Sequence, residues 1–269
     1  MVKAPQDRKY RSCCSSFFVK EEGVISLSLK TLTLVGTITM TVALFIMLYI
    51  TCWDDLLTKY HGIPVEEACS FSHHNPMVSD VICLPFFDRI WCILTTFFSL
   101  AVMQVNIRAF YKRFHGVLTV EENNAMVSWG WAICLSFPLI GYFDEWNYAP
   151  IHFTLAGIFF TSTCVYGHKL GNVFYHHRAQ FPRVSDNMVW WVKFQGNFML
   201  LMLPVFALSF AFHFHVPLWE WILAVSYINQ FIFSAFFNEF YDSVMPYHKR
   251  EKKEQESLET SYEPVQNMA

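Results

Sequence analysis

Six long apolar runs constrain this chain of 269 residues more than any other feature of its sequence. The runs cover residues 32–52, 90–107, 125–143, 149–167, 189–212 and 216–240. A helix needs about 20 apolar residues to cross the hydrocarbon core, with some variation from tilt. In lipid only helices and closed barrels satisfy their backbone polar groups, and these runs are continuous rather than alternating. The sequence therefore predicts an all-α polytopic membrane protein, a bundle of six transmembrane helices.

The distribution of positive charge predicts the orientation of this bundle. Of the 19 Lys and Arg residues, all but Lys59, Arg89 and Lys193 fall in segments on one side of the runs. Loops rich in Lys and Arg stay in the cytosol, so we expect both termini to be cytosolic. The chain then divides into a cytosolic tail (1–30), a six-helix membrane domain (31–243) with a lumenal loop at 53–87, and a cytosolic tail (244–269) of disordered composition.

Some features are expected to be absent. No stretch interleaves basic and aromatic residues as nucleic-acid surfaces do, so no nucleic-acid partner is predicted. Adjacent histidines occur twice, at His73–His74 and His176–His177, but neither pair has the spacing of a metal site, so no metal and no cofactor is predicted. No catalytic sequence motif and no Gly-x-x-x-Gly packing face is expected either.

Two cysteines lie in the predicted lumenal loop, where the environment is oxidising. A disulfide between Cys69 and Cys83 would close a loop of about 15 residues and stabilise it by about 3 kcal/mol on the loop-entropy model. Cys52, at the lumenal end of the first run, is an alternative partner. The sequence predicts the Cys69–Cys83 bridge and leaves that alternative open.

Ionisable residues gather at the lumenal ends of several predicted helices. They are Asp88, Arg89, Asp144, Glu145, His152, His213, His215 and Glu220. Ionisable groups at membrane depth are costly and often functional. A histidine near carboxylates can accept and release a proton, which is what general acid–base catalysis requires. The structural alternatives are an interfacial ion pair at Asp88 and Arg89 and a solvated turn at Asp144 and Glu145.

Short motifs near these residues resemble one family. Residues 75–80 (Asn-Pro-Met-Val-Ser-Asp) and 85–91 (Pro-Phe-Phe-Asp-Arg-Ile-Trp) are similar to the family's Pro-x-Ile/Val-Ser segment and to the start of its second helix. Residues 144–152 resemble its acidic turn followed by a histidine, and residues 219–221 and 238–242 resemble the two ends of its sixth helix. The family holds the GPI-anchor lipid-remodelling factors (post-GPI attachment to proteins factor two) and, in the same superfamily, the damage-regulated autophagy modulators.

The resemblance implies GPI-anchor biosynthesis by lipid remodelling in the Golgi or endoplasmic reticulum membrane. The reaction would be reacylation of a lyso-GPI intermediate, and the partners would be membrane lipids and GPI-anchored proteins. On this hypothesis His152 is the general base, Asp144 or Glu145 orients it, and Arg89 with Asp88 and Glu220 binds substrate. The resemblance does not separate an acyltransferase from an essential non-catalytic helper.

Two alternatives belong to other classes. A non-enzymatic regulator in endolysosomal or plasma membranes would resemble the autophagy-modulator branch, and Tyr262 begins a Tyr-x-x-apolar stretch of the kind that sorting adaptors bind. A small channel or transporter is the other alternative, although neither an internal repeat nor a line of charged residues favours it.

Overall fold

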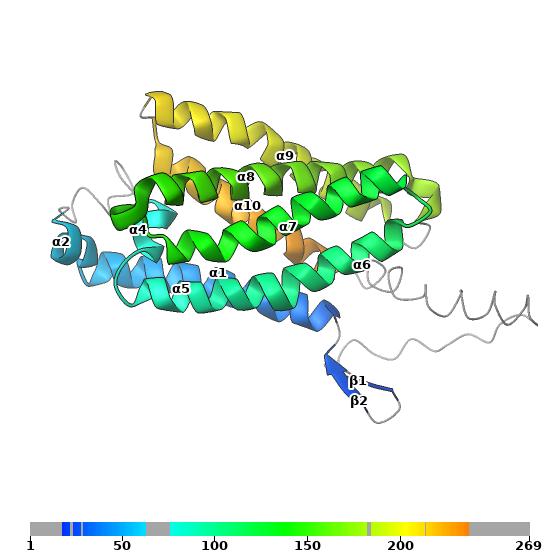
Figure 1. The fold of residues 1–269 in the computed structure, drawn as a ribbon, viewed down its shortest axis with the longest axis horizontal. Helices are drawn as coiled ribbons and strands as arrows, with labels where there is room; N and C mark the ends of the chain where they lie inside the picture. Colours follow the sequence, from blue (N-terminus) through cyan, green and yellow to red (C-terminus); the bar gives the residue numbers. More distant parts are fainter. Residues whose placement is uncertain are drawn as a thin grey trace, which may run out of the picture.

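Long helices lie side by side along the longest axis of the molecule (Figure 1). The computed structural model describes residues 18–21, 24–27, 29–62, 76–181, 184–212 and 214–236. The long helices are α1 (Leu29–Trp53), α5 (Phe87–Phe97), α6 (Gln104–Phe114), α7 (Val120–Tyr142), α8 (Glu145–His176), α9 (Asp186–Phe212) and α10 (Val216–Phe236). A small antiparallel hairpin, β1 (Phe18–Glu21) and β2 (Val24–Leu27), precedes α1. The predicted helical architecture is therefore confirmed.

Within the described residues, five helices are long and apolar enough to cross a membrane. They are Thr31–Trp53, Phe87–Phe114, Val120–Tyr142, Glu145–His176 and Asp186–Phe212, and each overlaps one of the first five apolar runs. Their outer faces carry large apolar side chains such as Ile46, Ile93 and Leu201, which are 52%, 69% and 62% exposed. Such a surface is suited to lipid rather than water. The chain is therefore a multi-pass membrane protein.

The sixth run forms a shorter apolar helix over Val216–Ile228 in the part of the chain whose side chains are described. The backbone of α10 continues to Phe236, and the last residues of the predicted run, 237–240, lie outside the described residues. Most of both predicted tails also lies outside them.

One transmembrane helix contains a π-helical segment. Residues Phe98–Met103 join α5 to α6 without a break, so that Phe87–Phe114 forms one span. In a π-segment the backbone hydrogen bonds join residues five positions apart instead of four, so the helix is wider there. Just after it, the Asn106 amide donates to the Thr33 hydroxyl at 2.9 Å and ties this span to α1.

Glycines let α8 and α9 approach backbone to backbone. A Cβ placed on Gly196 would lie 2.6 Å from the carbonyl carbon of Gly167, and one on Gly171 would lie 2.7 Å from the Cα of Lys193. Close contact at small residues is a common way for helices to associate in membranes. Gly167 and Gly171 are a Gly-x-x-x-Gly pair, so the expectation that the chain lacks such a face is wrong.

Two short helices lie at one end of the bundle. These are α2 (Leu56–His61) and α4 (Val78–Ile82), and we call this end the α4 end. It also holds the last turns of α1 and α7 and the first turns of α5, α8 and α10. Both short helices belong to the segment predicted as a loop, 53–87, of which residues 63–75 lie outside the described part.

Candidate functional site

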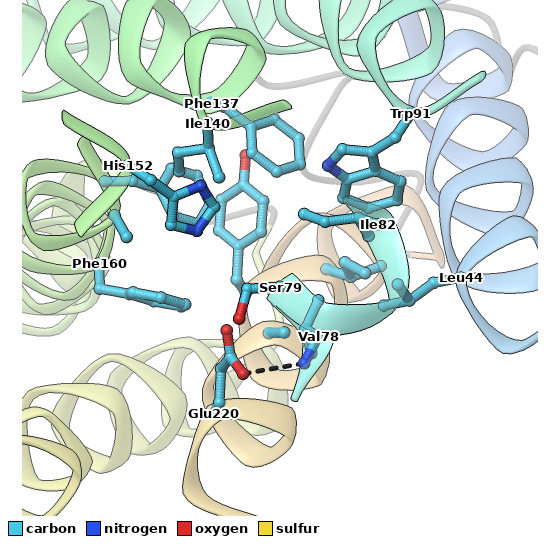
Figure 2. A pocket seen from close by; sticks show the side chains of 15 residues that line it. Leu44, Val78, Ser79, Ile82, Trp91, Phe137, Ile140, His152, Phe160 and Glu220 are labelled. Carbon is cyan, nitrogen blue, oxygen red and sulfur yellow. Dashed lines mark hydrogen bonds between the residues drawn. The ribbon is translucent and has the colours of Figure 1, made fainter. Parts of the chain in front are cut away.

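A small cavity of about 50 Å³ lies inside the α4 end (Figure 2). Its walls come from α1, α4, α5, α7, α8 and α10, and most of the lining is apolar. The lining residues are Leu44, Val78, Ser79, Ile82, Trp91, Phe137, Ile140, His152, Ala156, Phe159, Phe160, Glu220, Ala224, Tyr227 and Ile228. The cavity therefore collects residues from distant parts of the sequence around a few polar groups.

Aromatic rings form much of the wall. The ring centroids of Phe137 and Phe159 are 4.7 Å apart in a stacked arrangement, and Tyr227 meets Phe159 edge-on at 4.8 Å. Such pairs stabilise by about 0.5–1.5 kcal/mol beyond the area they bury. The Tyr227 hydroxyl donates a hydrogen bond to the Met103 sulfur at 2.7 Å. The rings therefore make a mainly apolar frame around the polar groups.

The short helix α4 is docked into the bundle by α10. The Val78 backbone N–H donates to the Glu220 Oε2 at 2.8 Å (Figure 2), and the Trp221 indole Nε1–H donates to the Pro76 carbonyl at 2.8 Å. Val78 and Ser79 are 7% and 3% exposed. The predicted lumenal loop thus contains a segment that is part of the packed core, which sequence spacing alone did not indicate.

His152 is positioned by a kink in α8. Tyr148 has non-helical backbone angles, and Pro150 follows it without an N–H to donate. The imidazole Nδ1 lies 2.8 Å from the Phe143 carbonyl oxygen, at the end of α7 where carbonyls lack helical partners. A carbonyl can only accept, so Nδ1 carries the proton and the neutral ring keeps a lone pair on Nε2. His152 is 2% exposed and lines the cavity.

Two further polar groups lie in the cavity wall. The Trp91 indole nitrogen is buried without a hydrogen-bond partner, whereas the Ser79 hydroxyl is buried beside the Glu145 and Glu220 carboxylates. Figure 2 shows the Ser79 oxygen directed toward the Glu220 carboxylate. Buried polar groups are nearly always paired, so the unpaired Trp91 nitrogen needs an explanation. Both residues lie within the motifs at 75–80 and 85–91, but the sequence alone indicates no role for either.

Three carboxylates gather beside Ser79. Glu145 interacts electrostatically with Asp80 and Glu220, and Glu220 interacts with Asp80. Asp80 also accepts the Met77 backbone N–H at 2.8 Å, which closes the first turn of α4. Burying carboxylates together is costly unless protons or a cation neutralise part of the charge. Among the described residues, no three His, Cys, Asp or Glu side chains are arranged to hold a metal ion.

Asp144 has a different role from the predicted one. Its carboxylate caps α8, accepting the Asn147 backbone N–H at 2.8 Å and the Asn147 side-chain amide at 3.0 Å. The group that orients His152 by a hydrogen bond is the Phe143 carbonyl rather than Asp144 or Glu145. A helix N-cap uses a carboxylate for its own backbone, which explains why an acidic turn appears at this position.

The predicted substrate-binding residues are only partly brought together. Glu220 lines the cavity, whereas Asp88 and Arg89 do not, and Arg89 is exposed. The Arg89 backbone N–H donates to the Asp88 carboxylate, so this pair forms a local turn contact and no side-chain ion pair. His215 is exposed, with a backbone φ of 47°, and His213 lies outside the described residues.

The predicted Cys69–Cys83 disulfide is not formed. Cys83 is a free, buried thiol, whereas Cys52, the alternative partner, is disulfide-bonded. Cys69 lies outside the described residues. Burial raises the pKa of the Cys83 thiol well above its usual range, so this group stays protonated and unreactive. Cys83 directly follows α4, and docking of that helix places the thiol in the core.

His61 closes the outer side of the α4 end. Its ring stacks on Trp146 with centroids 3.8 Å apart, which packs α2 against the start of α8. Burial lowers the pKa of His61, although Asp80 and Asp144 act in the opposite direction. This histidine was not singled out by the sequence analysis, because nothing in its local sequence marks it.

These observations define a class: a helical, multi-pass membrane protein with a mainly apolar cavity near one end of its bundle. An imidazole, a hydroxyl and a carboxylate border that cavity. No protein-family model, curated protein or solved structure matches the chain.

Proposed function

We propose that this protein takes part in GPI-anchor lipid remodelling, acting on the reacylation of lyso-GPI in the membrane of the Golgi or endoplasmic reticulum. One observation carries the proposal. The stretches that resemble the remodelling family, 75–80, 85–91, 144–152 and 219–221, are far apart in sequence but contribute Ser79, Trp91, His152 and Glu220 to one cavity. Motif residues that converge on one cavity are expected of a functional site, whereas chance matches to short motifs would be scattered over the fold.

The proposed orientation places this cavity at the lumenal level of the membrane. This orientation assumes six membrane spans, with α10 as the sixth, and two cytosolic termini. The distribution of Lys and Arg along the sequence favours it. The acyl chains of a GPI anchor lie in the lumenal leaflet. A cavity inside the bundle at that depth is therefore at the height where the reacting ester would be.

The residues of this cavity could support proton transfer next to a bound acyl chain. His152 would accept the hydroxyl proton of the lyso-lipid at Nε2 while that oxygen bonds to the acyl carbon of a donor ester or thioester. The same proton would then go to the departing oxygen or sulfur of the donor. Arg89 is exposed and outside the cavity, so the proposal gives it no part in binding substrate.

The cavity size bears on whether the chain is the acyltransferase or a helper. At about 50 Å³ it is far smaller than the roughly 300–1,000 Å³ of most ligand pockets. Catalysis would therefore require α4 to move away from Glu220 and Trp221. A regulator of the autophagy-modulator type needs no such opening, and this small volume favours it as the second candidate.

The experiment compares cells that lack the protein with cells that express it. We expect the loss to lower the amount of GPI-anchored proteins at the surface, or to leave lyso or altered acyl chains on their anchors. Mass spectrometry of the anchor lipids and imaging of the tagged protein provide the readouts. Unchanged anchor lipids together with an endolysosomal location would contradict the proposal and support the regulator.

A further inference from the structure

A second hollow lies between α6 and α7, at the end of the bundle opposite to the α4 end. It encloses about 270 Å³ and is lined by one stripe from each helix. The stripes are Gln104, Ile107, Arg108 and Tyr111 on α6, and Asn124, Val127 and Trp131 on α7. Residues three and four apart share one helix face, so the two stripes face each other across a groove. From Asn124 to Trp131 the helix rises about 10 Å, which sets the length of this α6–α7 groove.

Arg108 gives the groove a positive charge. The ion pair found in the described part of the chain joins Arg178 to Asp186, so no carboxylate there pairs with Arg108. The Arg108 guanidinium donates to the Gln104 amide oxygen at 2.9 Å in the amide orientation that satisfies both neighbours of Gln104. This contact holds the cation at the groove wall, and the Arg108 side chain is exposed. A planar guanidinium binds phosphate oxygens through two parallel hydrogen bonds.

Polar and apolar side chains both line the groove. Tyr111 and Asn124 lie nearest the end of the bundle, Arg108 and Val127 about one turn farther in, and Gln104 and Trp131 deepest. A second contact fixes the mouth, where the neighbouring Asn123 amide donates to the Tyr111 carbonyl at 2.9 Å. Tyr and Trp favour the boundary between headgroups and acyl chains. The groove therefore places a cation beside apolar side chains at the level of that boundary.

We propose that the α6–α7 groove binds one anionic phospholipid of the adjacent leaflet, with the phosphate on Arg108 and an acyl chain along Val127 and Trp131. Lys112 and Arg113 end α6 and Glu121 and Glu122 begin α7 at this end of the bundle, so their charges balance and the positive charge within the groove is that of Arg108. The groove shares no residue with the cavity at the α4 end. The inference therefore does not depend on the proposed function.

The test is native mass spectrometry of the full chain in detergent, titrated with phosphatidylserine or phosphatidylcholine. We expect tighter retention of phosphatidylserine. Arg108→Gln should weaken it about fivefold, because the guanidinium hydrogen bond to the phosphate is lost. Lys112→Gln removes the same charge from an exposed position on the same helix that does not line the groove, so only screened attraction is lost and binding should weaken less than about twofold. Equal losses in the two variants would overturn the site and leave only diffuse charge attraction.

A second pair of variants tests the apolar part. Trp131→Ala should also reduce phosphatidylserine retention, whereas Leu135→Ala, which removes an exposed side chain one turn away, should not. Soluble glycerophosphoserine distinguishes the source of the phosphate. If it displaces the lipid at equal concentration, or if Trp131→Ala has no effect in folded protein, the groove binds a soluble anion and the proposal is wrong.

Discussion

At the scale of single residues, the side chain that the account depends on most is His152. Its Nδ1–H is already committed to the Phe143 carbonyl, which fixes the tautomer and leaves Nε2 as the only nitrogen able to accept a proton. The sequence singled out this histidine after an acidic stretch, and its catalytic role stays a prediction. It could not reveal the orienting group, because a backbone carbonyl leaves no trace in the sequence.

Asp144 provides the first residue-scale prediction. Asp144→Asn keeps an oxygen that can accept the Asn147 N–H, so both stability and activity should stay near those of the wild type. Asp144→Ala loses the cap and should lower the free energy of unfolding by about 1 kcal/mol. Thermal unfolding in detergent measures both. A large loss of activity in Asp144→Asn at unchanged stability would restore the catalytic role that the sequence suggested.

At the scale of elements, α4 determines the shape of the site. Its docking contacts with α10 join residues 142 and 145 positions apart, beyond the reach of any local pattern. The sequence predicted a lumenal loop here because residues 53–87 lie between the first two apolar runs, and only the tertiary contacts show that part of it is core. The same insertion explains why Cys83 is a buried thiol.

The docking contact of α4 can be tested with paired variants of Glu220. Glu220→Gln keeps an oxygen for the Val78 N–H, whereas Glu220→Leu leaves that buried donor unpaired. Neither variant can ionise at this position, so the comparison between them reports on the hydrogen bond. The Leu variant should be less stable than the Gln variant by about 1–3 kcal/mol. Denaturant unfolding provides the comparison, and equal stabilities would mean that Glu220 does not hold α4.

The contact between α8 and α9 gives a second element-scale prediction. Gly196→Ala would place a methyl group against the backbone of Gly167 and should lower the melting temperature or prevent folding. Gly157→Ala is the matched control on α8, because nothing lies within 4 Å of its added Cβ. There the better helix propensity of Ala, about 1 kcal/mol, should leave stability unchanged or raise it. Similar melting temperatures for the two variants would contradict the close packing.

At the scale of the whole molecule, the sequence predicted the helical architecture well, because crossing a membrane imposes a length and composition that local reading can recognise. It predicted the site less well. His152 and Glu220 do meet at one cavity, but Arg89 lies outside it and Ser79 and Trp91 were given no role. Which helix ends face one another depends on contacts between residues that are far apart in the sequence. Such contacts leave no periodic pattern from which they could be predicted.

The proposed topology predicts where added glycosylation acceptors are modified. Acceptors inserted within 63–75 should receive a glycan, because the proposed orientation places this loop in the lumen. Acceptors inserted within 115–119 or 178–185, at the other end of the bundle, should not. Glycosidase-sensitive shifts on gels measure this. A glycan on either of the latter segments would contradict the orientation and place the cavity in the other leaflet.

The central claim is that the cavity at the α4 end acts on GPI-anchor lipids through His152. The most direct test expresses His152→Asn in cells that lack the protein, because the Asn amide nitrogen can take the place of Nδ1 toward the Phe143 carbonyl while nothing replaces Nε2. His176→Asn, at the exposed far end of α8, is the control. We expect mass spectrometry to show normal anchor acyl chains with the wild type and His176→Asn, and unrepaired anchors with a stably expressed His152→Asn. Full repair of the anchor lipids by His152→Asn would contradict the account.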